Sequence, residues 1–174
     1  MPKNIQKQAL NFFEKQKYSQ ALPLFEEVAT QENVSEDWFN VATCAVMAHE
    51  LARGQEALIK ATTLAEKEHN PDGLSAGMMH FYFMCALRDS DYVEEGMKAL
   101  EQLRESYVSL KITDDMFLSI RGLPPLQQFL AMGVGVLKKQ TGVLPQEWLI
   151  QFGNSLDAEG QTEVSTFVQE QFGN

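Results

Sequence analysis

The apolar positions of this chain recur at helical spacing. Between Ile5 and Val28 they fall three or four residues apart, which places each group on one face of a helix. A polar break at residues 15–17 divides the pattern into two groups. The segment therefore predicts a helical hairpin of residues 4–16 and 19–31.

Two more hairpins follow along the chain. In the second, a helix beginning near Ser35 is expected to stop at Gly54, and a return helix surrounds residues 57–65. The third pairs residues 75–88 with residues 93–107. Helical periodicity thus dominates the first two thirds of the sequence, and we predict an all-α fold.

The three return helices share one spacing. Each opens with a small residue, followed by an apolar residue four positions later and another three after that. These sets are Ala21, Phe25 and Val28; Ala57, Ala61 and Leu64; and Gly96, Leu100 and Leu103. A small residue lets two helices approach closely, while the larger residues fill the space toward a neighbouring hairpin.

This pattern resembles the tetratricopeptide repeat, a helix–turn–helix unit of about 34 residues. The first unit matches best, and its matching residues are Ala9, Phe12, Tyr18, Ala21 and Phe25. The later units are degenerate. The resemblance implies a right-handed superhelical stack of about three hairpins over residues 1–107, with the first helix of each hairpin lining a concave groove.

Carried over by matched frame, the resemblance assigns seven residues to partner binding in that groove. They are Phe13, Phe39, Val46, His49, Met78, Phe81 and Arg88. Aromatic and methionine side chains suit the capture of a partner segment. The resemblance therefore implies a non-enzymatic interaction module that acts as an adaptor, a dedicated chaperone or an inhibitor of the immunity type.

Residues 108–174 form a second region, for which we predict additional helices. They are expected near residues 113–120, 126–139, 145–152 and 157–172, packing on the repeats or capping them. Whether they cap the groove or fill it is left open by the sequence. The repeated Gln-Phe-Gly-Asn motif suggests that Gly153 and Gly173 end helices in a left-handed conformation.

Charge narrows the choice of partners. The chain has 174 residues with 14 Lys+Arg and 24 Asp+Glu, a formal net charge of −10. This acidity argues against nucleic acid and favours a protein or peptide with a basic or apolar surface. The longest apolar stretch, residues 122–137, is too short and broken for a membrane span. With no apolar leader segment, we expect a cytoplasmic protein without a membrane partner.

Candidate chemistry is sparse. His49, His69 and His80 lack the spacing of zinc ligands, and no phosphate-binding glycine loop occurs. We therefore expect no metal, no cofactor and no catalytic residue. Two alternatives stay open: an enzyme on a helical scaffold using His49, His80 or Cys85, and a structural subunit that self-associates. The chain is also similar to bacterial chaperones of type III secretion translocators, and an immunity protein would fit the acidity equally.

Overall fold

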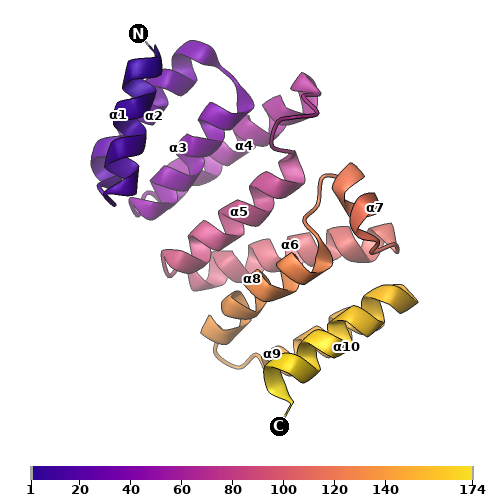
Figure 1. The fold of residues 1–174 in the computed structure, drawn as a ribbon. Helices are drawn as coiled ribbons and strands as arrows, with labels where there is room; N and C mark the ends of the chain where they lie inside the picture. The colour runs from indigo at the N-terminus through magenta and orange to yellow at the C-terminus, as the bar shows by residue number, and fades with distance from the viewer. Residues whose placement is uncertain (1, 174) are drawn as a thin grey trace. The chain divides into compact units, whose positions relative to one another are not determined.

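The computed structural model describes residues 2–173, and within this range the chain forms helices and turns but no strand. The predicted all-α class is therefore confirmed (Figure 1). The helices are α1 (Pro2–Glu14), α2 (Tyr18–Glu32), α3 (Ser35–Met47), α4 (Leu51–Glu68), α5 (Ala76–Asp89), α6 (Val93–Leu110), α7 (Asp115–Ile120), α8 (Leu126–Lys139), α9 (Pro145–Asn154) and α10 (Ala158–Phe172).

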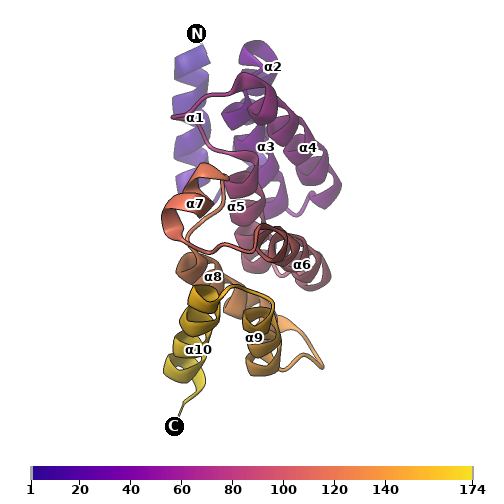
Figure 2. The same cartoon turned by 90° about the vertical axis from the view of Figure 1, so that its right-hand side faces the viewer.

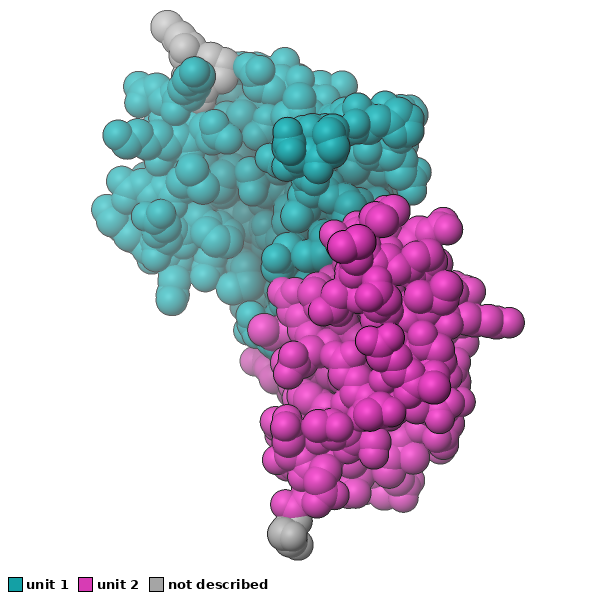
Figure 3. Space-filling view, turned by 45° about the vertical axis from the view of Figure 1, so that its right-hand side comes forward, with its two compact units in different colours: residues 1–90 teal, residues 91–174 magenta. Residues whose placement is uncertain are grey.

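The chain divides into two compact units, residues 1–90 and residues 91–174, which we call unit 1 and unit 2 (Figure 3). The division falls before the boundary predicted at residue 107, because α6 belongs to unit 2. There α6 packs on α8, and a Cβ atom added to Gly133 of α8 would lie 3.0 Å from Leu100 of α6. Leu100 of α6, which is completely buried, thus contributes to the core of unit 2.

Unit 1 consists of two helical hairpins and one further helix. The hairpins are α1–α2 and α3–α4, and α2 also contacts α3. Helix α5 packs against both α3 and α4. Ala21, Ala57 and Ala61, on the return helices of these hairpins, are almost completely buried.

Gly54 corrects one predicted boundary. Helix α3 already ends at Met47, and Gly54 lies inside α4 instead of ending a helix. A Cβ atom at Gly54 would lie 2.8 Å from Val46 Cγ2 and 3.0 Å from the carbonyl oxygen of Ala42. The glycine is therefore required for the close approach of α4 to α3, not for a turn.

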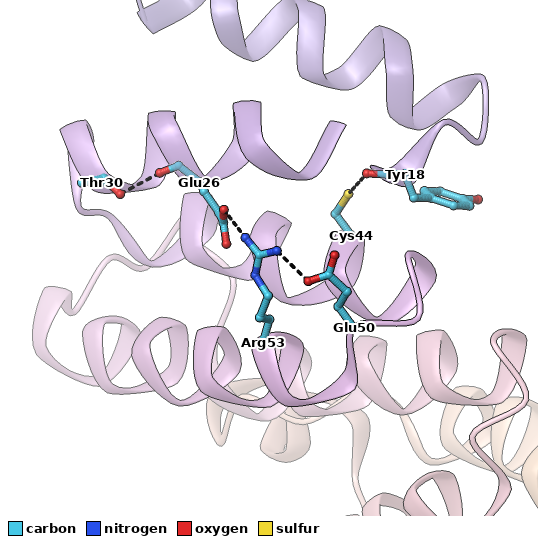
Figure 4. A network of polar contacts seen from close by, with 6 residues as sticks. All are labelled: Tyr18, Glu26, Thr30, Cys44, Glu50 and Arg53. Atoms are coloured by element: carbon cyan, nitrogen blue, oxygen red, sulfur yellow. Dashed lines mark hydrogen bonds and ion pairs between the residues drawn. The ribbon is translucent and has the colours of Figure 1, made fainter. Parts of the chain in front are cut away.

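An arginine links three segments of unit 1. Figure 4 shows Arg53 of α4 between Glu26 of α2 and Glu50, which precedes α4, with nitrogen–oxygen distances of 2.5 and 2.6 Å. Hydrogen bonds to Glu50 and Glu26 raise the pKa of Arg53. Because all three side chains are partly exposed, we expect the ion pairs to orient the helices more than to stabilise them.

Unit 2 is built around an aromatic core. Tyr107 of α6 is completely buried, and its hydroxyl donates a hydrogen bond of 2.7 Å to the carbonyl oxygen of Pro124. Its ring lies 4.6 Å from that of Phe129 and 6.2 Å from that of Phe152, measured between centroids. Burial raises the pKa of Tyr107. Three helices, α6, α8 and α9, therefore meet at one side chain.

The two Gln-Phe-Gly-Asn motifs do not both end helices as predicted. Gly153 lies within α9, where a Cβ atom would lie 2.9 Å from Val164 of α10. It allows α9 and α10 to pack side by side (Figures 1 and 2). Gly173 does end α10, but its φ of −69° is outside the left-handed region.

Asp157 fastens the start of α10 to the segment before α7. Its Oδ1 accepts hydrogen bonds from the backbone N–H of Gly160 at 2.9 Å and from the hydroxyl of Thr113 at 2.5 Å. Its Oδ2 accepts a third, of 3.1 Å, from the backbone N–H of Thr113. Burial raises the pKa of Asp157, but these hydrogen bonds outweigh it and leave the pKa below its ordinary value of 3.8.

Replacing Asp157 by alanine should therefore lower the free energy of unfolding by about 1–2 kcal/mol at neutral pH. Because the folded-state pKa is depressed, the stabilisation is present above pH 3.8 and is lost as the pH falls through the folded-state value. Urea unfolding of both proteins at neutral pH and at pH values below 3.8 would measure the difference. A difference that does not shrink in acid would contradict this account.

Candidate functional site

Helix α3 leaves one stripe of side chains open. Phe39, Thr43 and Met47 are half-buried and follow one another at intervals of four residues. Most of the remaining circumference of α3 is buried in unit 1. The open stripe therefore carries an aromatic ring, a hydroxyl and a thioether on a single helix face.

Helix α5 leaves a second stripe open. Met78 and Cys85 are half-buried, and Tyr82 between them is 39 % exposed. The position of the stripe is set by the start of α5, where the hydroxyl of Ser75 accepts a hydrogen bond of 3.1 Å from the backbone N–H of Met78. The residues that alternate with this stripe, among them Phe81 and Met84, are completely buried.

The two stripes adjoin, because contacts link α3 and α5 at both ends. Near their amino ends, the carboxylate of Glu36 accepts a hydrogen bond of 3.2 Å from the backbone N–H of Leu74. Near their carboxyl ends, the hydroxyl of Ser90 lies 3.1 Å from the sulfur of Met47. Helices α3 and α5 thus run parallel. The two α3 residues that make these contacts, Glu36 and Met47, lie on the same side of α3 as the open stripe.

We call this surface the α3–α5 face. It is defined by Phe39, Thr43, Met47, Met78, Tyr82 and Cys85. An aromatic ring, a phenol, two thioethers, a thiol and a hydroxyl make a predominantly apolar surface that can also form hydrogen bonds. Such side chains bind other polypeptides through shape and apolar contact.

Two of the residues predicted to bind a partner, Phe39 and Met78, lie on this face. Phe13 is half-buried on α1, where its ring lies 5.2 Å from that of Tyr18 and 6.1 Å from that of Phe25. Much of Phe13 thus serves the contact between α1 and α2. Phe39 of α3 and Met78 of α5 thus lie on two helices that contact each other.

Of the other four predicted residues, the structure corrects the assignment of two to an open groove. Val46 and Phe81 are completely buried, so neither presents a surface to a partner. His49 lies in the turn after α3, in a left-handed conformation with φ of 61°. Arg88 is half-buried, and its Nε donates to the carboxylate of Asp89 at 2.8 Å. For His49 and Arg88, which are not buried, partner binding stays a prediction.

Tyr82, Met47 and Thr43 were missed by sequence reasoning. Two of them directly follow a residue that was assigned to the groove, because Tyr82 follows Phe81 and Met47 follows Val46. For Phe81 and Tyr82, the sequence contained a signal for which of the two is exposed. Of two adjacent aromatic residues, tyrosine tolerates partial exposure because its hydroxyl can remain in water, whereas phenylalanine favours the core.

The chemistry of the thiols opposes a nucleophilic role. Burial raises the pKa of the Cys85 thiol, and although Arg88 lowers it, Asp89 raises it again. Burial, followed by the charges of Glu26 and Glu50, raises the pKa of Cys44 to about 12. Both thiols are therefore protonated at neutral pH, whereas a nucleophilic cysteine requires the thiolate.

No histidine on α5 assists Cys85. His80 lies five residues before it on the same helix, so the two side chains point about 140° apart around the helix axis. Among residues 2–173, no group of three or more His, Cys, Asp or Glu side chains has an arrangement that could hold a metal ion. The α3–α5 face offers apolar contact surface and groups that can form hydrogen bonds.

None of the helices described between residues 2 and 173 combines the length and the apolar character that crossing a membrane requires. Comparisons of the chain with protein-family models, with curated proteins and with solved structures find no match.

Proposed function

We propose that unit 1 is a non-enzymatic protein-interaction module that holds a segment of a partner polypeptide on the α3–α5 face. The observation that carries the proposal is the pair of adjoining stripes, in which aromatic and thioether side chains stay partly exposed on two parallel helices. Side chains of these kinds are the ones that most often anchor protein interfaces.

The charge around the face favours a basic or neutral partner. Unit 1 has 12 Asp+Glu and 8 Lys+Arg, which gives 8 − 12, a net charge of −4. Glu36 lies at the amino end of the α3 stripe, whereas Asp89 at the carboxyl end of α5 is paired with Arg88. A partner segment with apolar anchors and a basic residue near Glu36 would be complementary to this arrangement. Adaptor, chaperone and immunity roles all require this kind of recognition.

The tetratricopeptide-like architecture is part of the same proposal. In its support, α5 packs on both helices of the preceding hairpin, and successive first helices α3 and α5 run parallel. A right-handed superhelical stack would follow if the same step related each hairpin to the next. On this account the stack in unit 1 consists of two hairpins and the first helix of a third.

Peptides selected from a displayed random library against the whole chain provide the test. We expect selection to yield peptides with aromatic or aliphatic anchors and flanking Lys or Arg. Replacing Phe39 or Tyr82 by alanine should weaken their binding about tenfold or more, because each truncation removes a central anchor. Fluorescence anisotropy of labelled peptides would measure the dissociation constants.

Ile59 provides the matched control, since it is an apolar side chain 66 % exposed on α4, outside the α3–α5 face. Ile59→Ala should leave peptide binding unchanged. Circular dichroism should show the same helix content in all three variants. The proposal would be overturned by peptides that bind both face variants as tightly as the unaltered chain, or by a selection that yields no specific peptide.

A further inference from the structure

The start of α3 carries more carboxylates than the nearby backbone uses. Glu68 of α4 accepts hydrogen bonds from the backbone N–H of Ser35 at 2.8 Å and from its hydroxyl at 2.6 Å. Glu36 accepts one of 3.2 Å from the backbone N–H of Leu74. Asp37, which follows Glu36 in the first turn of α3, forms no hydrogen bond or ion pair within the described part of the chain.

Asp37 is nevertheless buried, with 8 % of its surface exposed. Moving a carboxylate out of water without giving it a partner is unfavourable. Burial raises the pKa of Asp37, and the negative charges of Glu32 and Glu36 raise it further. The folded chain therefore disfavours the charged form of Asp37.

The carboxylate of Asp37 can still be reached from solvent. Among residues 2–173, the polar side-chain atom that is both fully enclosed and without a hydrogen-bond partner is Arg104 Nε, in unit 2. Because the oxygens of Asp37 also lack a partner, they are not fully enclosed. Access this restricted suits a cation at the end of a long apolar stem, such as the side chain of lysine or arginine.

The acidic group lies at one end of the α3–α5 face. Glu36 is three residues before Phe39 on the same side of α3, and Asp37 lies about 100° farther around the helix. At the other end of the face, Asp89 is paired with Arg88 at 2.8 Å. Of the two ends, the one beside Phe39 therefore carries the carboxylates that lack a cation.

We propose that Asp37 and Glu36 bind a lysine or arginine side chain of the partner segment whose apolar anchors lie on the α3–α5 face. This inference rests on the proposed function of that face, and it gives the bound segment a direction. The basic residue lies beyond the Phe39 end, and the apolar anchors extend from there toward the carboxyl ends of α3 and α5.

A side-chain cation fits this arrangement better than a metal ion does. No group of three or more His, Cys, Asp or Glu side chains between residues 2 and 173 has an arrangement that could hold a metal ion. One cationic group needs only one or two carboxylates, and its hydrogen bonds to them are charge-assisted. A carboxylate that is already desolvated also attracts a cation more strongly than one in water does.

The inference makes an unusual prediction about stability. Asp37→Asn removes the charge and keeps the size of the side chain. Because the folded chain disfavours the charged form, the midpoint of urea unfolding at neutral pH should rise. A carboxylate whose role was to stabilise the start of α3 would instead lower the midpoint when it is removed.

Fluorescence anisotropy with the whole chain tests the binding itself. The probes are three labelled forms of a selected peptide, in which the basic residue is lysine, arginine or the uncharged norleucine. The unaltered chain should bind a basic form about tenfold more tightly than the norleucine form. Comparison of the lysine and arginine forms identifies the preferred cation. Asp37→Asn should remove most of the preference for a basic residue.

Two further variants complete the test. Glu36→Gln keeps an acceptor for the backbone N–H of Leu74 and should also weaken the preference for a basic residue. Glu56→Gln changes the net charge equally, but at an exposed position of α4 outside the α3–α5 face, and should leave the preference unchanged.

The outcomes separate this inference from the proposed function. If Phe39→Ala weakens peptide binding but Asp37→Asn leaves the preference for a basic residue intact, the cation site is wrong and the α3–α5 face stands. A lower urea midpoint for Asp37→Asn would overturn the cation site as well. A selection that yields no specific peptide would overturn both proposals.

Discussion

Replacing Phe81 by alanine is expected to lower the free energy of unfolding by about 3–5 kcal/mol, whereas the same change at Tyr82 should cost less than about 1 kcal/mol. Phe81 is completely buried, and removing its ring leaves a cavity in the core of unit 1. Tyr82, the next residue on α5, is 39 % exposed and can lose its ring without opening the core.

Urea unfolding followed by circular dichroism would measure both effects. The neighbouring pair is its own control, because the two residues share helix α5 and differ chiefly in the direction of their side chains. In the peptide-binding assay the order of the two variants should reverse. Where both variants remain folded, Tyr82→Ala should weaken peptide binding more than Phe81→Ala. Equal losses of stability would contradict the orientation of α5 on which the α3–α5 face depends.

The second large effect is expected at Tyr107. Tyr107→Ala should destabilise the protein by about 3–5 kcal/mol, because the ring fills the space between Phe129 and Phe152. Tyr107→Phe keeps the ring but leaves the carbonyl oxygen of Pro124 without its donor. That variant should lose about 1–2 kcal/mol.

Denaturant unfolding monitored by tryptophan fluorescence suits this test. Trp148 lies in the same cluster, with its ring 5.6 Å from that of Phe152 and its Nε1 donating to Glu101 at 2.6 Å. A Tyr107→Phe variant as unstable as Tyr107→Ala would show that the hydroxyl dominates. A harmless Tyr107→Ala change would contradict the central position of Tyr107 in unit 2.

The helices themselves were largely predictable from local signals. Helical periodicity located most of the helices within a few residues of their observed bounds. Ser75 caps the start of α5 and Asp157 caps the start of α10, each through its side chain. A polar residue just before an apolar run is the usual sequence signal of such a cap. Such contacts span three residues, so a linear reading of the chain detects them.

Glycines were the least predictable elements of the fold. Gly54 and Gly153 both suggested helix ends, yet each lies within a helix where another helix comes close. A glycine at a turn and a glycine at a helix crossing look alike in sequence. Only the identity of the opposing residue, Val46 or Val164, distinguishes them, and that contact is not local.

The candidate site was predictable in kind but not in register. The prediction of aromatic and methionine side chains on the first helices agrees with the presence of Phe39 and Met78 on the α3–α5 face. A shift of one residue turns a helix by about 100°, enough to exchange an open position for a buried one. The repeat pattern in α3 and α5 was too degenerate to resolve this shift, hence the errors at Val46 and Phe81.

The assignment of α6 shows a similar limit. Gly96, Leu100 and Leu103 follow the spacing of a return helix, which predicted a partner in α5. In the structure a Cβ atom at Gly133 of α8 would lie 3.0 Å from Leu100, and α8 is a neighbour that this spacing did not predict. Periodicity identifies the buried face of a helix, but it does not say which neighbour covers that face.

The central claim is that a partner segment lies across α3 and α5, and methyl NMR of methionine-labelled protein tests it most directly. Met47 and Met78 lie on the α3–α5 face, Met79 and Met84 are completely buried in unit 1, and Met116 lies on α7. On adding a selected peptide, we predict that the methyl signals of Met47 and Met78 shift or broaden first, while that of Met116 stays unchanged. A response at Met116 alone, with Met47 and Met78 unaffected, would contradict the account.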